Sequence, residues 1–405
     1  MAVGQFDTTA TRSSYDVVIV GGAMYGSAVA WFLTENPDFD GSVLVIERDP
    51  TYANSATART NSCIRQQFSN QLNVKISQFG ATFIKGFKAF MGNDPRVPDL
   101  SIQSYGYMYL ADTDAFANQL RAAQDVQKNA GAATQLMTPD QIRSAYPFYN
   151  VDDIVLGSIN LIDEGYWDGG TVFDWWRRSA RERGVEYIAG KVSSMRVVGR
   201  RVHSVNLANG DVIACGKVVN ATGPRGAKTA AMAGIRIPVE PRKRFTWIFS
   251  AEQPLGQVLP LTIDPSGVHF RQDGPNTYLA GGHAHPDLVA DFDDFTMDHT
   301  LWQDKIWPII ATRIPQFEAI KVVTEWAGHY DYNTLDQNAI LGPHTEIDNF
   351  FFVNGFSGHG LQQSPALGRG TAEMLTYGAY RTLDLTPFGF ERIVADSPFA
   401  ESAII

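Results

Sequence analysis

The residues with the clearest chemical potential in this chain form two glycine-rich segments near its opposite ends. The first is Gly21-Gly22-Ala23-Met24-Tyr25-Gly26, and Glu47 ends the next apolar run. Glycines allow the backbone to approach a pyrophosphate at a helix N-terminus, and an acid at the second strand's end can bond ribose hydroxyls. Ala23 replaces the middle glycine of the Gly-x-Gly-x-x-Gly pattern. The segment still predicts dinucleotide binding, with a structural turn as the alternative.

The second segment is Gly355-Phe356-Ser357-Gly358-His359-Gly360-Leu361-Gln362-Gln363, between an apolar run and a helical stretch. The backbone N–H groups of the four residues from Gly358 to Leu361, with the dipole of the following helix, would form a positive nest. A reduced flavin is an anion, and a fixed donor nest at the charged edge of its ring would favour acceptance of a hydride. The alternative is a loop that only tightens the start of a helix.

Each glycine-rich segment needs a strand before it and a helix after it. Residues 15–20 and 43–47 are apolar runs without alternation, as in strands buried on both faces of a parallel sheet, and residues 23–33 between them have helical spacing. Residues 350–354 form a similar run, and residues 362–375 follow as a helix. These units predict a mixed α/β (α+β) fold with a Rossmann-like domain.

Between the two units the pattern changes. Residues 238–332 alternate aromatic and polar side chains, which is typical of an antiparallel sheet with one solvated face. Short strands are expected within 185–219, and helices at 71–90, 113–129 and 171–183. We therefore predict a discontinuous nucleotide-binding domain and an inserted antiparallel-sheet substrate domain. The first comprises residues 1–90, 150–235 and 335–405, and the second comprises residues 91–149 and 236–334.

Composition excludes several classes of protein. The 405 residues are 44% hydrophobic and 19% charged, as in a folded globular chain, and the net charge of −10 argues against nucleic-acid binding. Only Cys63 and Cys215 are present, which fits a reducing compartment. The chain has neither an apolar run long enough to span a membrane nor a signal peptide, so a cytoplasmic location is expected and residues 1–14 are interpreted as a frayed tail.

Together with the two glycine-rich segments, Val219-Asn220-Ala221-Thr222-Gly223-Pro224 and Trp326-Ala327-Gly328 resemble blocks of the D-amino-acid oxidase superfamily of FAD enzymes. This superfamily includes sarcosine oxidase, glycine oxidase and dimethylglycine dehydrogenase. The likeness is strongest to the branch of FAD-dependent oxidoreductase domain proteins, because of Gly358-His359-Gly360-Leu361-Gln362-Gln363 and Tyr330-Asp331-Tyr332-Asn333-Thr334. The matching blocks are spread over nearly the whole chain.

The resemblance implies FAD as the cofactor. Sarcosine oxidases bond the flavin to a cysteine at the position that His329 takes here, so non-covalent FAD is expected, with a histidyl link as the alternative. The expected FAD-binding residues come from both ends of the chain and from the middle: Gly21, Gly22, Ala23, Met24, Gly26, Glu47, Arg48, Ser55, Thr57, Ser62, Ile64, Arg65, Val192, Ala221, Thr222, Gly223, Gly328, Gly355, Ser357, Gly358, His359, Gly360, Leu361 and Gln362.

The resemblance also implies where a substrate would bind. Arg65 matches an arginine near the flavin ring and the substrate carboxylate in sarcosine oxidases, and an arginine fork can hold a carboxylate with two hydrogen bonds. A surface or supporting arginine is the alternative. Arg65, Tyr330, His359 and Arg271 form the predicted catalytic set, and Arg244 is a further candidate for the carboxylate anchor.

Two departures from sarcosine oxidases bear on the chemistry. Gln362 replaces a lysine that helps to bind the substrate carboxylate, and no lysine lies between Lys243 and Lys305, where several oxidases carry one that promotes the reaction with O₂. A nearby cation stabilises the superoxide formed in the first electron transfer. The sequence therefore predicts slow reoxidation by O₂, unless Arg271 or a protonated His283 supplies the charge.

These observations predict an FAD-dependent amine or amino-acid dehydrogenase or oxidase. It would oxidise the C–N bond of an amino acid or N-alkylated amino acid by hydride transfer to flavin N5, giving an imine that hydrolyses. The alternatives are oxidation of a hydroxy acid, or a flavin-stabilised assembly factor with little turnover. The expected partners are a small-molecule amine and an electron acceptor, either O₂ or a quinone or other carrier. No metal site is expected.

Overall fold

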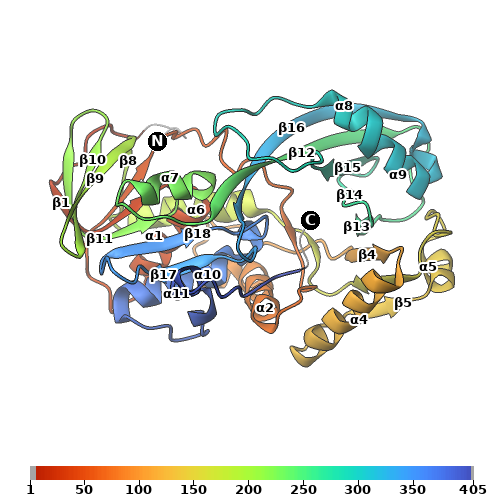
Figure 1. The fold of residues 1–405 in the computed structure, drawn as a ribbon, viewed down its shortest axis with the longest axis horizontal. Coiled ribbons are helices and arrows are strands. Elements are labelled where there is room, and N and C mark those ends of the chain that lie inside the picture. The colour runs from red at the N-terminus through yellow and green to blue at the C-terminus, as the bar shows by residue number, and fades with distance from the viewer. Residues whose placement is uncertain (1–5, 403–405) are drawn as a thin grey trace.

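The computed structural model describes residues 6–402 and places their strands in two large sheets that lie side by side (Figure 1). The first sheet has the order β17-β18-β11-β1-β2-β8, with β10 and β9 continuing from β11. Its strands are β1 (Ser14–Val20), β2 (Val43–Glu47), β8 (Glu186–Ala189), β9 (Val192–Val198), β10 (Arg201–Leu207), β11 (Val212–Asn220), β17 (Ile340–Pro343) and β18 (Phe350–Asn354). The pairs that join β18, β11, β1, β2 and β8 are parallel.

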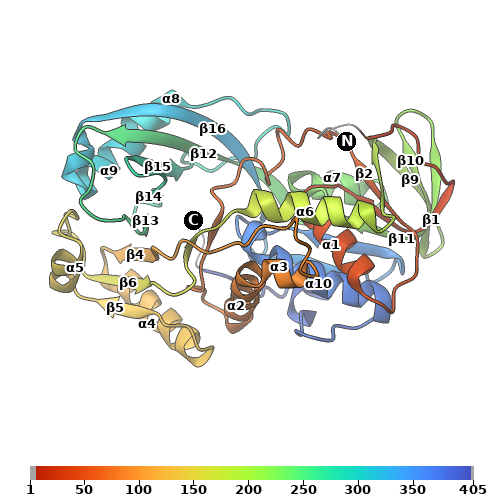
Figure 2. The ribbon, with the colours of Figure 1, turned by 180° about the vertical axis from the view of Figure 1, so that it is seen from behind.

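Strand β1 is buried on both faces, which explains why its sequence does not alternate. Val17 and Ile19 pack into one hydrophobic core, and Val18 and Val20 pack into another on the opposite face. Helices α1 (Met24–Glu35), α2 (Gln71–Lys85), α6 (Gly169–Glu182) and α10 (Gly360–Tyr377) contribute to the first core (Figure 2). Strands β9 and β10 and helix α7 (Gly226–Ala231) contribute to the second.

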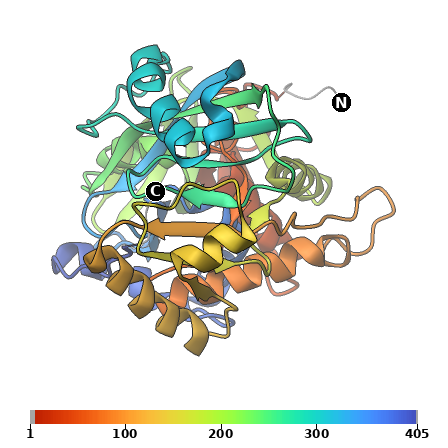
Figure 3. The same cartoon turned by 90° about the vertical axis from the view of Figure 1, so that its right-hand side faces the viewer.

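The second sheet has the order β16-β12-β15-β14-β13-β4-β6-β5. Its strands are β4 (Tyr107–Ala111), β5 (Gln135–Met137), β6 (Leu156–Asn160), β12 (Val239–Ala251), β13 (Leu261–Ile263), β14 (His269–Gln272), β15 (Thr277–Gly282) and β16 (Ile320–Asn333). The pairs are antiparallel except that of β13 with β4. Helices α4 (Asp114–Asn129) and α5 (Pro139–Ala145), in gold, and α8 (His299–Leu301) and α9 (Trp307–Arg313), in teal, lie at opposite ends of this sheet (Figure 3).

Most predicted elements are confirmed, with differences at their ends. The helix expected at 71–90 is divided at Gly86 into α2 and α3 (Phe87–Phe90), and the helix expected from residue 362 begins at Gly360. A small ladder joins β3 (Cys63–Ile64) to β7 (Gly165–Tyr166), and α11 (Glu391–Val394) follows α10.

The interpretation of residues 1–14 as a frayed tail is wrong for the part that the structure describes. The Phe6 ring lies 5.5 Å from that of Tyr187, and the Ala189 N–H donates to the Asp7 carbonyl at 2.8 Å. These contacts attach the segment to β8. Residues 1–5 lie outside the described residues.

The division into two discontinuous domains stays a prediction, and the pairing of β6 bears on one boundary. The predicted nucleotide-binding domain includes residues 150–235, but β6 in this range pairs with β4 and β5 of the second sheet. We propose to move this boundary beyond Asn160, because a strand shares the core of the sheet that it pairs with.

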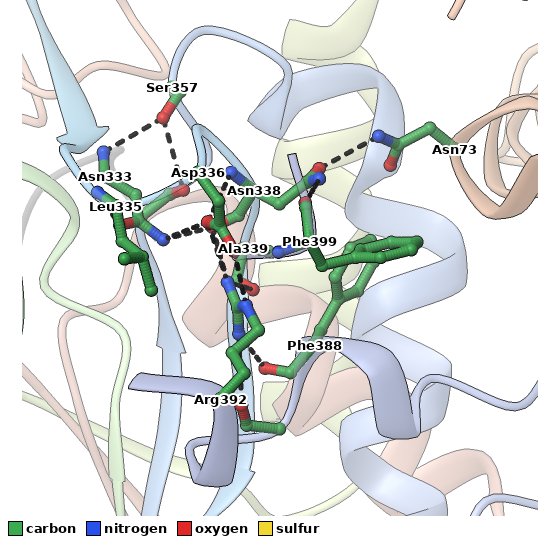
Figure 4. A network of polar contacts seen from close by, with 12 residues as sticks. Asn73, Asn333, Leu335, Asp336, Asn338, Ala339, Ser357, Phe388, Arg392 and Phe399 are labelled. Carbon is green, nitrogen blue, oxygen red and sulfur yellow. Dashed lines mark hydrogen bonds and ion pairs between the residues drawn. The ribbon is translucent and has the colours of Figure 1, made fainter. Parts of the chain in front are cut away.

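A buried ion pair fastens the chain after β16. The Asp336 carboxylate has no exposed surface and accepts from Arg392 Nε at 2.6 Å and Nη2 at 3.1 Å (Figure 4). It also accepts from the Asn333 side chain at 2.9 Å and from the Phe399 N–H at 3.0 Å. Arg392 donates in turn to the carbonyls of Phe388, Asn338 and Ala339. The network holds the end of β16 against the C-terminal segment.

We expect Arg392→Met to lower the free energy of unfolding by about 3–5 kcal/mol, because it leaves the Asp336 carboxylate buried without its counter-ion. Arg200→Met is the matched control: Arg200 pairs with Asp348 at 2.7 Å, but both side chains are about half exposed. The control should lose less than about 1 kcal/mol. Urea unfolding measures both, and equal losses would contradict the assignment of a structural role to the buried pair.

Candidate active site

One cavity of 510 Å³ is lined by both glycine-rich segments and by the second sheet. Gly21, Glu47 and Thr222 line it at the carboxyl ends of β2 and β11 and after β1, where ligands bind in open α/β sheets. Arg244, Leu261 and His269 line it from the second sheet. The volume lies within the range of small-molecule and cofactor sites, about 300–1,000 Å³.

The first glycine-rich segment forms a tight turn that Glu47 fixes. A Cβ built on Gly26 would collide with the carbonyl oxygen of Gly21, so the third glycine of the pattern is required for close packing of α1 on the turn. The Gly22 N–H donates to Glu47 Oε2 at 2.8 Å, and Met24 N donates to Thr57 Oγ1 at 3.2 Å. Burial raises the pKa of Glu47. Glu47 therefore supports the turn as well as lining the cavity.

The second segment adopts backbone conformations that suit glycine. Gly358 has φ +90°, and a Cβ there would collide with the ring of Tyr330. Ser357 has φ +50°, its N–H donates to the Asp331 carbonyl at 3.1 Å, and its Oγ accepts from Asn333 N at 3.0 Å. Strand β16 thus sets the path of this loop, and Tyr330 lies directly beneath it.

Tyr25 joins the two glycine-rich segments. Its ring stacks on Phe356 at 3.8 Å between centroids with 2° between the planes, and its hydroxyl donates to the Gly360 carbonyl at 2.7 Å. Tyr25 and Gly360, which are separated by 335 positions in the sequence, therefore belong to one surface.

The predicted donor nest needs a correction. The His359 N–H donates to the Phe356 carbonyl at 2.9 Å, because the turn before α10 closes a backbone hydrogen bond at that residue. The nest is therefore limited to Gly358, Gly360 and Leu361, all of which line the cavity. Gly360 and Leu361 belong to the first turn of α10, where N–H groups have no partner within the helix.

Arg65 lies in the cavity wall with 1% of its surface exposed. Its guanidinium lies over the Phe68 ring, 4.5 Å from the centroid, and Nη1 donates to the Tyr109 hydroxyl. The backbone N–H of Arg65 donates to Gln362 Oε1 at 2.8 Å. Gln362, which replaces the lysine of sarcosine oxidases, thus positions the backbone of Arg65.

Two buried carboxyl groups near these residues were missed as site candidates. Burial raises the pKa of Asp331 to about 7 and that of Glu164 to about 7. Asp331 lines the cavity, and its Oδ2 accepts from the Gly355 N–H at 3.0 Å. Glu164 accepts from Gln66 N at 2.6 Å, next to Arg65. The position of Asp331 beside Tyr330 was the available signal, whereas nothing in the local sequence indicates that Glu164 is buried.

Burial lowers the pKa of three histidines in or next to the second sheet, which favours their neutral forms. Burial lowers the pKa of His269 to about 3, and its Nε2 lies 3.0 Å from the Asn61 amide nitrogen. Burial also lowers the pKa of His283 and His329. The His329 Nε2 contacts the Asp294 carbonyl at 2.8 Å, and the ring stacks on Phe295.

Most of the predicted site residues line the cavity. They are Gly21, Ala23, Met24, Glu47, Arg48, Ser55, Thr57, Ser62, Arg65, Val192, Ala221, Thr222, Gly223, Gly328, Tyr330, Ser357, Gly358, His359, Gly360, Leu361 and Gln362. Five others are not part of its lining: Gly22, Gly26, Ile64, Gly355 and Arg271. Arg271 Nη1 bonds Asp273 at 3.1 Å and Nη2 bonds the Asn61 carbonyl at 3.1 Å, so these contacts hold it outside the cavity.

The described residues fit FAD. The turn after β1, held tight by Gly26, leaves backbone N–H groups at the start of α1, where a pyrophosphate is bound in dinucleotide sites. Gly358 carries no side chain where the loop passes the Tyr330 ring. The N–H groups of Gly360 and Leu361, in the first turn of α10, belong to residues that line the cavity beside this loop. No group of His, Cys, Asp and Glu residues that could hold a metal occurs within residues 6–402.

The chain belongs to the DAO family of FAD-dependent oxidoreductases, whose family model matches residues 16–374. It is 36% identical to FAD-dependent oxidoreductase domain-containing protein 1 of Xenopus laevis, over 96% of this chain and 85% of that protein. It is 24% identical to the sarcosine oxidase subunit beta of Rhizobium meliloti, over 91% of this chain and 86% of the relative. FAD is therefore the cofactor, as the sequence predicted.

Solved structures share the fold. L-Proline dehydrogenase from P. horikoshii matches with a TM-score of 0.81 and 24% identity, over 96% of this chain and 99% of that chain. Glycine oxidase from Geobacillus kaustophilus matches with a TM-score of 0.78 and 20% identity, over 93% and 98% of the two chains. The mixed α/β architecture predicted from the sequence is confirmed. No helix within residues 6–402 is long and apolar enough to cross a membrane.

The raised pKa of Asp331 predicts a pH-dependent difference between the wild type and Asp331→Asn. The folded wild type keeps this carboxyl protonated below about pH 7, whereas the unfolded chain ionises it above the ordinary aspartate pKa of 3.8. Wild-type stability from this group is therefore lost as pH rises from about 4 to 7, by about 1.4 kcal/mol per unit. The free energy of unfolding of Asp331→Asn should therefore rise relative to that of the wild type between about pH 4 and pH 7, and the difference should not increase further above pH 7.

Urea unfolding at several pH values measures this difference. Asp348→Asn is the control, because the Asp348 pKa is lowered by its hydrogen bond with Arg200 and the group stays ionised in both states above pH 5. A difference between wild type and Asp331→Asn that does not change with pH would show that Asp331 is ionised in the folded protein.

Proposed function

We propose that this flavoprotein oxidises the C–N bond of an amino acid or N-alkylated amino acid, giving an imine that water hydrolyses. The observation that carries the proposal is the position of Arg65, a buried arginine in the wall of the cavity that also contains the Gly358 loop. FAD, bound non-covalently, supplies the chemistry by accepting a hydride at N5. The hydride leaves the carbon next to the amine nitrogen.

The remaining roles follow from the contacts around the cavity. Arg65 holds the substrate carboxylate, because a guanidinium can donate two parallel hydrogen bonds to it. Tyr330 lies beneath Gly358 and provides an aromatic wall for the substrate. His359 lies in the same loop with its ring 5.1 Å from that of Phe68, so it connects this loop to the aromatic ring under Arg65.

The described surroundings keep the substrate amine neutral, which hydride transfer requires. Asp331 is protonated below about pH 7, and the His269 imidazole is neutral above about pH 3. Burial of the amine beside Tyr330 and the guanidinium of Arg65 disfavours its charged form. Catalysis therefore depends on orientation and desolvation more than on a protein base.

Anaerobic bleaching of the flavin spectrum tests the proposed function. The purified holoenzyme is mixed with a panel of amino acids, N-methyl amino acids, cyclic imino acids and hydroxy acids, and absorbance is followed over time. Rapid bleaching by a member of one of the amine classes would support the proposal. Bleaching by hydroxy acids alone would replace it with alcohol oxidation, and a flavin inert to the whole panel would contradict it.

We expect Arg65→Ala to weaken binding of the acid that serves as substrate by about 1.5–3 kcal/mol, which is the contribution of a hydrogen bond to a charged group. FAD should be retained. The dependence of the bleaching rate on substrate concentration measures this affinity. Tyr109→Phe is the control, because it removes only the hydroxyl group that accepts from Arg65 Nη1 and leaves the guanidinium in place. An unchanged affinity in Arg65→Ala would move the anchor elsewhere.

We also expect slow reoxidation of the reduced flavin by O₂. Lys243 bonds Asp294 at 2.5 Å and Lys305 bonds the His283 carbonyl at 3.3 Å, and neither lysine lines the cavity. Of the alternative sources of charge, Arg271 bonds Asp273 and the Asn61 carbonyl and does not line the cavity, and burial lowers the pKa of His283. Arg244, which does line the cavity, is paired with Asp287. Mixing the dithionite-reduced enzyme with air-saturated buffer measures the rate. Reoxidation as fast as substrate-driven reduction would contradict a dehydrogenase, and acceleration by a quinone would support one.

A further inference from the structure

A segment without helix or strand, residues 287–296 and here called the strap, crosses one side of the cavity. Phe292, Asp293 and Phe295 of the strap line the cavity. The Ala290 N–H donates to the Pro241 carbonyl at 2.9 Å, which attaches the strap beside the start of β12. Arg242 also donates to the Asp287 carbonyl, and farther along the strap the Phe295 ring stacks on His329.

Four cations from the surrounding elements pair with three acids of the strap, and one of these cations, Arg48, lies 3.6 Å from Asp293. Arg225 bonds Asp293 at 2.5 Å, and Lys243 bonds Asp294 at 2.5 Å. The third acid forms a bidentate pair: Arg244 Nη1 donates to Asp287 Oδ1 at 3.0 Å, and Nη2 donates to Oδ2 at 2.9 Å. Both nitrogens of the guanidinium fork are thus directed at one carboxylate, which is the geometry in which arginine binds carboxylates strongly.

Arg244 lies within the candidate active site, whereas Asp287 does not line the cavity. The Arg244 guanidinium lies over the Tyr330 ring, 4.6 Å from the centroid, and its buried Nε has no hydrogen-bond partner among the described residues. Only 8% of Arg244 is exposed. Asp287 therefore occupies the guanidinium of Arg244, and an acidic ligand in the cavity would compete with Asp287 for it.

Asp287 and its neighbours can leave at little cost in buried apolar surface. The Asp287 side chain is 25% exposed, and the next two residues, Leu288 and Val289, are 69% and 55% exposed. Segments with few buried apolar contacts open at low free energy. Arg244 is fixed between β15 and β16 by the pairing of β12, so it stays in place when Asp287 moves.

Charge decides which ligands could displace Asp287. Leaving a buried guanidinium unpaired is strongly unfavourable, whereas replacing one carboxylate by another keeps Arg244 compensated throughout. A neutral ligand offers no such replacement. An exchange at Arg244 would therefore respond to acids and not to neutral amines.

We propose that Asp287 is a carboxylate gate: an acidic ligand takes its place on Arg244, and the strap near Asp287 moves out towards solvent. The gate selects ligands that carry a carboxylate and opens one side of the cavity when they bind. This inference rests on the proposed function for the identity of the natural acid. It makes Arg244 a second guanidinium that contacts the acid besides Arg65, and it makes Asp287 the residue that controls access to Arg244.

Benzoate, a carboxylate without an oxidisable amine, is the probe. The holoenzyme is titrated with benzoate, and the perturbation of the flavin spectrum gives the apparent Kd. Asp287→Asn keeps the size of the side chain and removes the competing charge, so we expect benzoate to bind at least tenfold more tightly than to the wild type. Arg244→Lys should weaken binding, and the double variant Arg244→Lys/Asp287→Asn should lose the gain, because the two residues act through one contact.

Asp294→Asn is the matched control, with the same change of charge on the same strap at an acid that pairs with Lys243 instead of Arg244 and that does not line the cavity. It should change the benzoate Kd less than twofold. Limited proteolysis of the wild type gives a second measurement: benzoate should accelerate cleavage within residues 287–292 at least threefold, and benzyl alcohol should not.

Equal affinity in wild type and Asp287→Asn, or an equal gain in Asp294→Asn, would overturn the gate. So would the absence of any spectral response to benzoate in both the wild type and Asp287→Asn, or cleavage that benzoate slows. Failure of the proposed function is a separate outcome, because a flavin that no amine bleaches would still report benzoate binding at Arg244.

Discussion

The Asp336 carboxylate has no exposed surface, so buried donors must replace the water that it has lost, and the structure around the cavity depends on how this requirement is met. Arg392 supplies the charge, and the Asn333 side chain and the Phe399 N–H supply further donors (Figure 4). Asn333 is the last residue of β16, the strand that carries Tyr330 and Asp331. Because Asn333 N also donates to Ser357 Oγ, the ion pair fixes the strand and the adjacent Gly358 loop together.

The same kind of constraint recurs around the cofactor cavity, where polar groups of one segment fix the backbone of another. Glu47 accepts from the Gly22 N–H, and Gln362 accepts from the Arg65 N–H. In both cases a side chain expected to contact a ligand also fixes the segment that carries another ligand-binding residue. Catalytic geometry of this precision requires such support, because small displacements of positioning groups lower the rate strongly.

The sequence alone predicted the parts of the molecule that depend on local pattern. The unalternating run of β1, the glycines of the first turn and the loop before α10 are local signals, and the structure places them around one cavity. Contacts between distant segments could not be predicted in this way. Arg271 was expected in the site because of its charge, but Asp273 and the Asn61 carbonyl hold it outside. Likewise, only the tertiary structure buries Glu164 and pairs Arg244 with Asp287.

The stacking of Tyr25 on Phe356 has a consequence for how the protein is made. Parallel pairs such as β1 with β11 and β11 with β18 also join residues far apart in sequence, and closing long loops costs chain entropy before any contact compensates for it. The N-terminal glycine turn is synthesised more than three hundred residues before the loop that completes its surface. A nascent chain can therefore form the first βαβ unit early, but it can acquire a complete flavin pocket only after the loop that follows β18 has been synthesised. Cofactor binding therefore follows the contact between the N-terminal glycine turn and the loop after β18.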